Sequence, residues 1–135
     1  MVFQIEERVR FGDVDAMGHV NNVTYIRHME TARTEYYMAR AGQHALEEMD
    51  IILARVACDF RSPAKFGETI IIAVWPTRIG ETAFTLAYRL TEKASGRLVA
   101  EGETVQVAYD YAMKSKKPIP PTLRALLERE LASSG

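Results

Sequence analysis

The segment DVDAMGHVNN contains the residue types that could do chemistry: Asp13, Asp15 and His19, and then Asn21 and Asn22 at its end. Carboxylates and an imidazole can move protons, activate water or attack a carbonyl carbon. An apolar repeat with spacings of three and four begins after the asparagines and predicts a helix there. The free N–H groups and partial positive charge of a helix start can polarise a carbonyl oxygen. The segment is therefore a candidate active site.

Other chemistries would need other partners. A calcium loop that began at Asp13 would need an oxygen ligand where Met17 stands and a glutamate where Thr24 stands. A zinc site would need more histidines or cysteines. We therefore expect no metal at the segment. Asp13 and Asp15 could also form an acid/base pair of the glycosidase kind, or could each cap a turn. Their spacing alone leaves these alternatives open.

Two elements are predicted to flank the segment. Phe3, Ile5, Val9 and Phe11 alternate with mostly polar neighbours, which indicates a strand with one buried face. A loop from about residue 12 to 21 joins this strand to the helix. Asn21 or Asn22 fits the N-cap position of the helix, and Gly42 fits its C-terminal end. The helix carries an apolar stripe of Val23, Ile26, Met29, Ala32, Tyr36 and Ala39.

Four more strands are predicted: alternation of apolar residues indicates strands at 52–60, 84–90 and 99–111, and the run at 69–75 is apolar on both faces, which indicates a strand in the centre of the sheet. Turn residues at 79–81 and 94–96 favour antiparallel hairpins, and leucines after the prolines at 118–121 predict a short C-terminal helix. One long helix with a mostly antiparallel five-stranded sheet is typical of an α+β domain, which we expect to span residues 1–135. One helix does not protect both edges of such a sheet, so self-association is expected.

The composition excludes several classes of protein. The chain has 135 residues, a formal net charge of -1 and one cysteine. The charge does not favour nucleic acid or an anionic membrane as a partner. The longest apolar run is too short to span a bilayer, and the N-terminal residues do not have the layout of a signal peptide. Cys58 cannot form an internal disulfide bond, so we expect a cytoplasmic protein.

The motif D-x-D-x-x-G-H-V-N-N, followed by a tyrosine and by E-x-A-R-x-E, resembles the signature of the hotdog-fold acyl-CoA thioesterases of the 4-hydroxybenzoyl-CoA thioesterase type. The segments DFRSPAKFGETI and RIGETAFTLAYRL are similar to later strands and turns of that family. The resemblance extends to about Tyr111. The residues that carry its first part are Asp13, Asp15, Gly18, His19, Val20, Asn21, Asn22, Tyr25, Glu30, Ala32, Arg33 and Glu35.

The resemblance implies a hotdog fold, in which a curved antiparallel sheet wraps a long helix. It also implies a homodimer joined through sheet edges, often paired into a tetramer, with active sites at the dimer interface. The family's catalytic carboxylate corresponds to Asp15, and the amide that polarises the thioester carbonyl corresponds to Asn22. Asp15 would be the nucleophile or a general base for water, and the motif does not separate these routes. No metal or redox cofactor is implied.

Substrate contacts are predicted at further positions. Gly18 would permit a tight turn or the close approach of a ligand. His19 would orient the substrate, move a proton, or simply bond to the loop backbone, and Asn21 would cap the helix or contact substrate. Tyr25 would line an acyl pocket or belong to the core. Basic side chains should line the path of the coenzyme A phosphates, and the candidates are Arg61, Lys65 and Arg89.

The sequence thus predicts an acyl-CoA thioesterase that releases a free carboxylic acid and coenzyme A. Two alternatives remain open. One is a hotdog hydratase or dehydratase acting on acyl thioesters, for which His19 would be the partner of Asp15. The other is a non-catalytic protein that binds acyl-CoA or an acyl-carrier protein. The identity of the acyl group is not predicted.

Overall fold

The computed structural model describes residues 2–42 and 50–134. Along the chain, the elements are β1 (Phe3–Arg8), the short 3-10 helix η1 (Phe11–Asp13), α1 (Asn22–Ala41), β2 (Ile51–Phe60), β3 (Thr69–Ile79), β4 (Ala83–Glu92), β5 (Leu98–Asp110), β6 (Ser115–Lys116) and α3 (Pro121–Ser134). Within this part of the chain, no helix is long and apolar enough to cross a membrane.

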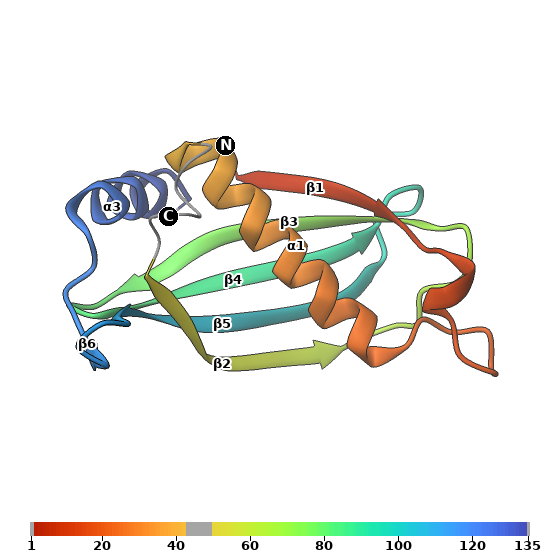
Figure 1. Ribbon diagram of the computed structural model, residues 1–135. Coiled ribbons are helices and arrows are strands. Elements are labelled where there is room, and N and C mark those ends of the chain that lie inside the picture. Colours follow the sequence, from red (N-terminus) through yellow and green to blue (C-terminus); the bar gives the residue numbers. More distant parts are fainter. Residues whose placement is uncertain (1, 43–49, 135) are drawn as a thin grey trace.

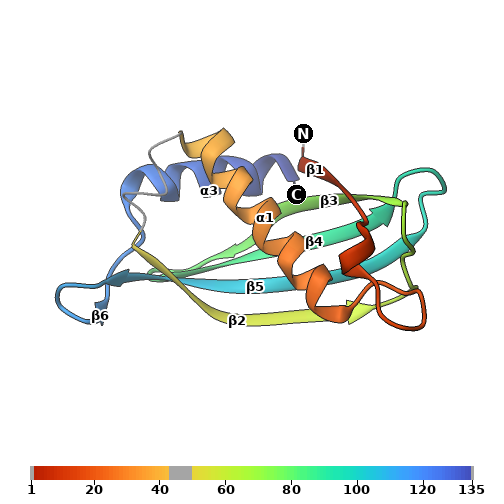
Figure 2. The ribbon, with the colours of Figure 1, turned by 45° about the vertical axis from the view of Figure 1, so that its right-hand side comes forward.

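The strands form one antiparallel sheet in the order β1-β3-β4-β5-β2, and the two-residue strand β6 pairs with β5. Helix α1 runs diagonally across one face of this sheet, and α3 packs beside it against β3 (Figure 1). Both helices lie on the same side of the sheet (Figure 2). A long helix held against an antiparallel sheet is the hotdog fold, so the predicted fold class is confirmed. The strand β6 was not predicted.

Alternation along the strands builds the core beneath the helices. On β4, Phe84, Leu86, Tyr88 and Leu90 are buried, while Arg89 between them is exposed. On β3, Ile70, Ile72 and Val74 are buried on the same side, and the intervening residues are half-buried. The central strands therefore present one face to α1 and α3 and the other face away from both helices.

Two details of the predicted apolar pattern are wrong. Phe11 does not extend β1, because the chain turns into η1 and leaves its side chain 80% exposed. Val23 and Ile26 are also largely exposed, as is Ala39, so the helix stripe lies further round α1 than predicted. One side of the helix packs against the sheet, so apolar residues at neighbouring positions of the helix remain exposed to solvent. The buried side of α1 consists of Thr24, Tyr25, His28, Met29, Ala32, Tyr36 and Tyr37.

Strand β2 lies at one end of the sheet and pairs only with β5 among the described strands. The register shifts between Leu53 and Arg55, so a bulge interrupts the ladder. Much of β2 is exposed, including Leu53 and Phe60, although alternation along this strand predicted one buried face. A long edge strand with exposed apolar side chains is a surface that can pair with another chain.

Gly102 on β5 marks the closest packing of the sheet. A Cβ atom at this position would collide with the carbonyl oxygen of Ala57 on β2, and it would lie 3.0 Å from Cε of Met29 on α1. Gly102 pairs with Cys58 on one side and Tyr88 on the other. The absence of a side chain here lets β2 and the helix approach β5.

Candidate active site

Asp15 sits in a tight hairpin just before α1. Val14 and Val20 pair across the hairpin, and the Asp15 N–H donates to the His19 carbonyl oxygen at 2.8 Å. Gly18 has a φ of 81°, which an L side chain rarely adopts, so it permits the tight turn as predicted. The hairpin thereby fixes the backbone from which the Asp15 carboxylate projects.

One oxygen of the Asp15 carboxylate holds the loop. Its Oδ1 accepts the Met17 N–H at 2.9 Å and the His19 N–H at 3.3 Å. Its Oδ2 has no hydrogen-bond donor among the residues that the structure describes, and the side chain is exposed. The carboxylate is therefore oriented through one oxygen and leaves the other open to a ligand or to water.

The start of α1 is capped by Asn21, one of the two predicted caps. The Asn21 side chain accepts the Val23 N–H at 2.9 Å, and the Asn21 N–H donates to the Asp13 carbonyl oxygen at 2.8 Å. Within the described part of the chain, the N–H of Asn22 has no acceptor. An amide of this kind, at the positive end of a 20-residue helix, is suited to bind a carbonyl oxygen or an anion.

A hollow of about 420 Å³ brings this loop and helix start together with the end of β2. Five of the predicted site residues line it, from both sides of the hollow. The lining residues are Asp15, His19, Val20, Asn22, Tyr25, Phe60, Arg61, Ser62 and Pro63. An amide donor, a carboxylate and an imidazole thus share one open cavity with apolar walls.

The structure does not bring the other four predicted residues into this hollow. Gly18 lies in the turn, and Asn21 is occupied as the cap. Lys65 pairs through its backbone with His19, and its N–H donates to Glu68, while its side chain is exposed. Arg89 lies on the sheet face away from α1, in a separate hollow with Trp75 and Glu101. In this chain Arg89 is therefore remote from Asp15.

Tyr25 and Arg61 line the hollow but are already engaged. The Tyr25 hydroxyl accepts the Ala64 N–H at 3.0 Å, and its ring lies 5.5 Å from that of Phe60. Burial raises the pKa of Tyr25. The Arg61 guanidinium donates to Glu101 at 2.9 Å, so part of its charge is already neutralised. Tyr25 is thus a fixed wall of the hollow, and Arg61 a partly paired cation at its rim.

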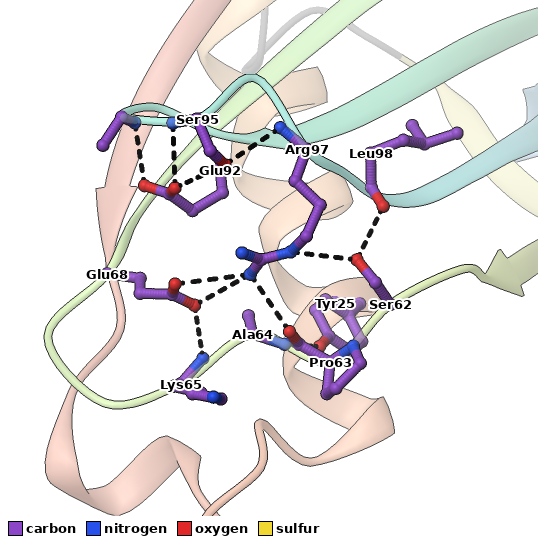
Figure 3. A network of polar contacts seen from close by, with 11 residues as sticks. Tyr25, Ser62, Pro63, Ala64, Lys65, Glu68, Glu92, Ser95, Arg97 and Leu98 are labelled. Atoms are coloured by element: carbon purple, nitrogen blue, oxygen red, sulfur yellow. Dashed lines mark hydrogen bonds and ion pairs between the residues drawn. The ribbon is translucent and has the colours of Figure 1, made fainter.

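Arg97 holds the loop that forms the second wall of the hollow, a role that no pattern in the sequence indicates. Its guanidinium donates to Ser62 Oγ at 3.2 Å, to the Pro63 carbonyl oxygen at 3.1 Å and to Glu68 at 3.1 Å (Figure 3). Ser62 in turn donates to the Leu98 carbonyl oxygen at 2.7 Å. The network fixes the position of residues 62–68 beside the hairpin of Asp15.

Asp13, only two residues from Asp15, lies on the other flank of α1. It is buried, and it accepts hydrogen bonds from the Arg10 N–H at 2.9 Å and from the Arg27 guanidinium at 2.5 Å. Burial opposes its ionisation, but these two donors outweigh burial and hold the pKa of Asp13 below its usual range. The carboxylate therefore ties α1 to η1.

His28 is buried near this pair. No partner for its Nδ1 is present among residues 2–42 and 50–134. Burial lowers the pKa of His28, and the charge of Asp13 only partly opposes that effect. The imidazole therefore stays neutral in the folded protein to a lower pH than in the unfolded chain.

Several known proteins are similar to this chain in sequence. The sequence profile of the Thioesterase-like superfamily matches residues 9–127. The chain is 25% identical to the acyl-CoA thioester hydrolase YbgC of Escherichia coli, over 92% of this chain and 94% of that protein. It is 23% identical to a 1,4-dihydroxy-2-naphthoyl-CoA hydrolase of Synechococcus elongatus, over 93% of this chain and 95% of that protein.

A solved structure gives a similar result. A thioesterase of Thermus thermophilus, complexed with coenzyme A and zinc, superposes with a TM-score of 0.85 at 27% identity. The superposition covers 97% of this chain and 94% of that one. The similarity to these proteins, in sequence and in fold, therefore extends along almost the whole length of the chain.

Proposed function

Because the chain belongs to the Thioesterase-like superfamily, we propose that it is an acyl-CoA thioesterase, which hydrolyses an acyl-CoA to a free carboxylic acid and coenzyme A. One observation carries the assignment of the site: Asp15 has a carboxylate oxygen and Asn22 an amide that find no partner in residues 2–42 and 50–134, and both residues line the same hollow. Thioester hydrolysis needs these two elements, a base or nucleophile and a donor to the carbonyl oxygen.

In the proposed reaction, the thioester carbonyl oxygen accepts a hydrogen bond from the Asn22 N–H. Negative charge develops on this oxygen during attack, and the amide at the positive end of α1 stabilises it. Asp15 either takes a proton from the attacking water, whose oxygen bonds to the carbonyl carbon as the C–S bond breaks and coenzyme A leaves as the thiolate, or attacks the carbonyl carbon itself. In the second route, a mixed anhydride forms, coenzyme A leaves as the thiolate, and water then hydrolyses the anhydride. Water is the only co-reactant, and no metal or redox cofactor takes part.

We propose that the working unit is a dimer joined through β2. Among the described strands β2 pairs with β5 alone, and this edge position and the exposed Leu53 and Phe60 support the assignment. Phe60 also lines the hollow, so a partner strand at this edge would lie next to the substrate. Arg61 and Lys65, exposed at the same end, are proposed to bind the phosphates of coenzyme A. The proposal is also compatible with a tetramer made of two such dimers. It is equally compatible with an acyl-carrier-protein thioester as the substrate and with a cytoplasmic location.

The named substrates of relatives narrow the panel to be tested. One relative acts on 1,4-dihydroxy-2-naphthoyl-CoA, and one structural neighbour with 23% identity is described as a gentisyl-coenzyme A thioesterase. Both acyl groups are hydroxylated aromatic rings. We therefore propose aromatic acyl-CoA esters as the first class to examine, with short and medium aliphatic esters for comparison.

The test is thiol release from this panel by the native protein and by Asp15→Asn, which keeps the size of the side chain and removes its charge. We expect the native protein to release coenzyme A, and the variant to be slower by about a hundredfold or more at unchanged substrate affinity. Asp13→Asn is the matched control, because it makes the same change two residues away on the other flank of α1.

Two other results would contradict parts of this proposal. Release that survives Asp15→Asn would contradict the assigned carboxylate. If the folded native protein binds acyl-CoA and releases no thiol, the enzyme assignment fails and the non-catalytic alternative replaces it.

A further inference from the structure

The peptide unit that joins Pro63 to Ala64 is held at both ends. Its carbonyl oxygen accepts a hydrogen bond from the Arg97 guanidinium at 3.1 Å, and its N–H donates to the Tyr25 hydroxyl at 3.0 Å (Figure 3). A peptide unit is planar and rigid, so these two hydrogen bonds together fix its orientation. Because the cation polarises the carbonyl group, it also strengthens the hydrogen bond to Tyr25. Arg97 is thereby linked to Tyr25, a wall of the hollow, through one peptide unit.

The next carbonyl group along the chain leads to the hairpin that carries Asp15. The Ala64 carbonyl oxygen accepts the Val20 N–H at 3.0 Å, and a bridge between His19 and Lys65 continues this pairing. Ala64 and Val20 are both buried, so water does not replace the hydrogen bond between them. A displacement of Ala64 would therefore move the hairpin, and the Asp15 carboxylate with it.

The Arg97 guanidinium is itself fixed by further contacts. Its Nε donates to Ser62 Oγ at 3.2 Å, and its Nη2 donates to the two carboxylate oxygens of Glu68 at 3.1 and 3.3 Å. Glu68 Oε1 also accepts the Lys65 N–H at 2.7 Å. One side chain from outside the segment 62–68 therefore joins the two ends of that segment (Figure 3).

The three groups that accept hydrogen bonds from Arg97 suit a planar donor. They are the hydroxyl of Ser62, the carbonyl group of Pro63 and the carboxylate of Glu68. A guanidinium presents its N–H groups in a rigid fork, whereas the ammonium of lysine is a point charge on a flexible stem. A lysine at this position can keep the ion pair with Glu68, but it cannot reproduce the fork.

Arg97 is not among the residues that line the hollow, so it has no direct contact with a substrate bound there. Loss of its hydrogen bonds should therefore leave most of the binding of the substrate intact. It should instead loosen the position of Asp15 relative to the wall formed by Tyr25. A displacement of about 1 Å at a reacting group can cost about a hundredfold in rate. The expected effect is on turnover more than on affinity.

We propose that Arg97 is a positioning residue for the reaction in the hollow. It orients the peptide unit between Pro63 and Ala64. This peptide unit holds Tyr25 directly, and Ala64 holds the hairpin of Asp15 through its own carbonyl group. The role rests on the proposed function, since it concerns the hydrolysis assigned to Asp15.

Steady-state thiol release from the best substrate of the panel tests the role in Arg97→Ala and Arg97→Lys. We expect kcat of Arg97→Ala to fall at least about tenfold, with KM within about threefold of the native value. Arg97→Lys keeps the charge and loses the fork, so its kcat should also fall, by at least about threefold. Arg97→Lys is the milder change and keeps the test valid if Arg97→Ala does not fold.

Arg124→Ala is the matched control. Arg124 on α3 also donates from its guanidinium to a backbone carbonyl oxygen, that of Gly80, and it also pairs with a carboxylate, that of Glu128. Its side chain is 34% exposed, and that of Arg97 is 37% exposed. Gly80 follows the end of β3, whereas the segment 62–68 precedes its start, so the two arginines act at opposite ends of this strand. We expect Arg124→Ala to lower the free energy of unfolding, as Arg97→Ala does, and to leave kcat unchanged.

Hydrogen exchange separates this role from the proposed function, because it needs no substrate. The amides of Val20 and Ala64 should exchange faster in Arg97→Ala than in the native protein, and at the native rate in Arg124→Ala. Faster exchange in a protein that cleaves no thioester would contradict the proposed function and would still support the hold of Arg97 on the hairpin.

Several results would overturn the positioning role. One is a native kcat in Arg97→Ala, and another is an equal fall of kcat in Arg124→Ala. Native turnover in Arg97→Lys would show that charge alone suffices, which contradicts a role for the planar fork. Unchanged exchange of Val20 and Ala64 in Arg97→Ala would remove the link between Arg97 and the hairpin.

Discussion

Asp13 and Asp15 stand two residues apart in the same loop, and the fold gives them opposite environments. Asp13 is buried and bonded to Arg10 and Arg27, so its charge is used to hold α1 against η1. Asp15 is exposed, and within the part of the chain that the structure describes only its Oδ1 accepts hydrogen bonds, which hold its own turn. The difference arises because Asp13 ends η1 and bonds back to Arg10, while Asp15 begins the turn of the hairpin, at 15–19.

This comparison gives a physical criterion for telling a structural carboxylate from a chemical one. A carboxylate whose acceptor sites are filled by the fold contributes stability and has no atom left for substrate. A carboxylate that is oriented by one oxygen and free at the other can react without losing its position. The two roles should therefore separate when activity and stability are measured on the same pair of variants.

The largest effect is expected for Asp15→Asn on turnover. A loss of about a hundredfold corresponds to about 2.7 kcal/mol of transition-state stabilisation. The midpoint of thermal unfolding should stay close to that of the native protein, since the amide oxygen still accepts the Met17 and His19 N–H groups. Differential scanning fluorimetry beside the turnover assay checks this prediction. A variant that is both inactive and strongly destabilised would remove the distinction between the two aspartates.

Asp13→Asn should show the reverse pattern. The substitution replaces a charged hydrogen bond to Arg27 by a neutral one in a buried place, and we expect a loss of about 2 kcal/mol in the free energy of unfolding. Urea unfolding at neutral pH measures this loss. Turnover of the fraction that remains folded should stay within a few-fold of native turnover. A hundredfold loss of turnover would place Asp13 in the chemistry as well.

The two asparagines allow a smaller version of the same comparison. Asn21→Ala removes the cap that accepts the Val23 N–H, and it should cost about 1 kcal/mol of stability. Asn22→Ala removes an exposed side chain and keeps the backbone amide, so stability and turnover should both change little. Urea unfolding and thiol release test the pair. A large loss of turnover in Asn22→Ala would show that its side chain, beyond its amide, contacts the substrate.

The smallest effect concerns pH. The pKa of His28 is lowered in the folded protein, so the unfolded chain binds this proton more readily. Stability should fall as the pH drops below about 6.5, until the pH reaches the folded-state pKa of His28. His28→Gln should flatten this part of the profile by a slope below about 1.4 kcal/mol per pH unit. Urea unfolding at several pH values checks it, and an unchanged slope would exclude His28 as the cause.

The features that sequence predicted correctly are those set by neighbouring residues. Asn21 caps the helix, Gly18 turns the hairpin and Gly42 ends α1, because each depends on backbone geometry within a few positions. The places of the strands along the chain could be predicted from apolar patterns, because these patterns also depend on residues close together in the sequence. The motif around Asp15 added what local pattern could not, namely the family; the role that it gives Asp15 stays a prediction.

The misses involve contacts between distant segments. Arg97 braces Ser62 and Pro63 from another hairpin, and no spacing in the sequence relates them. The position of Phe11 depended on η1, which rotates the chain out of the strand pattern. Arg89 could have been placed correctly, since it alternates with the buried Tyr88 and Leu90 and must face the other way. Strand parity is therefore a useful check before a basic residue is assigned to a substrate.

Gly102 has a consequence for how sequence variation in this fold is interpreted. Its position leaves no room for a methyl group between β2, β5 and Met29. In a saturation library screened only for soluble expression, we therefore expect glycine alone to survive at position 102. Such invariance would resemble that of a catalytic residue, although Gly102 performs no chemistry. Tolerance maps of this protein need a stability screen beside the activity screen before constraint is attributed to function.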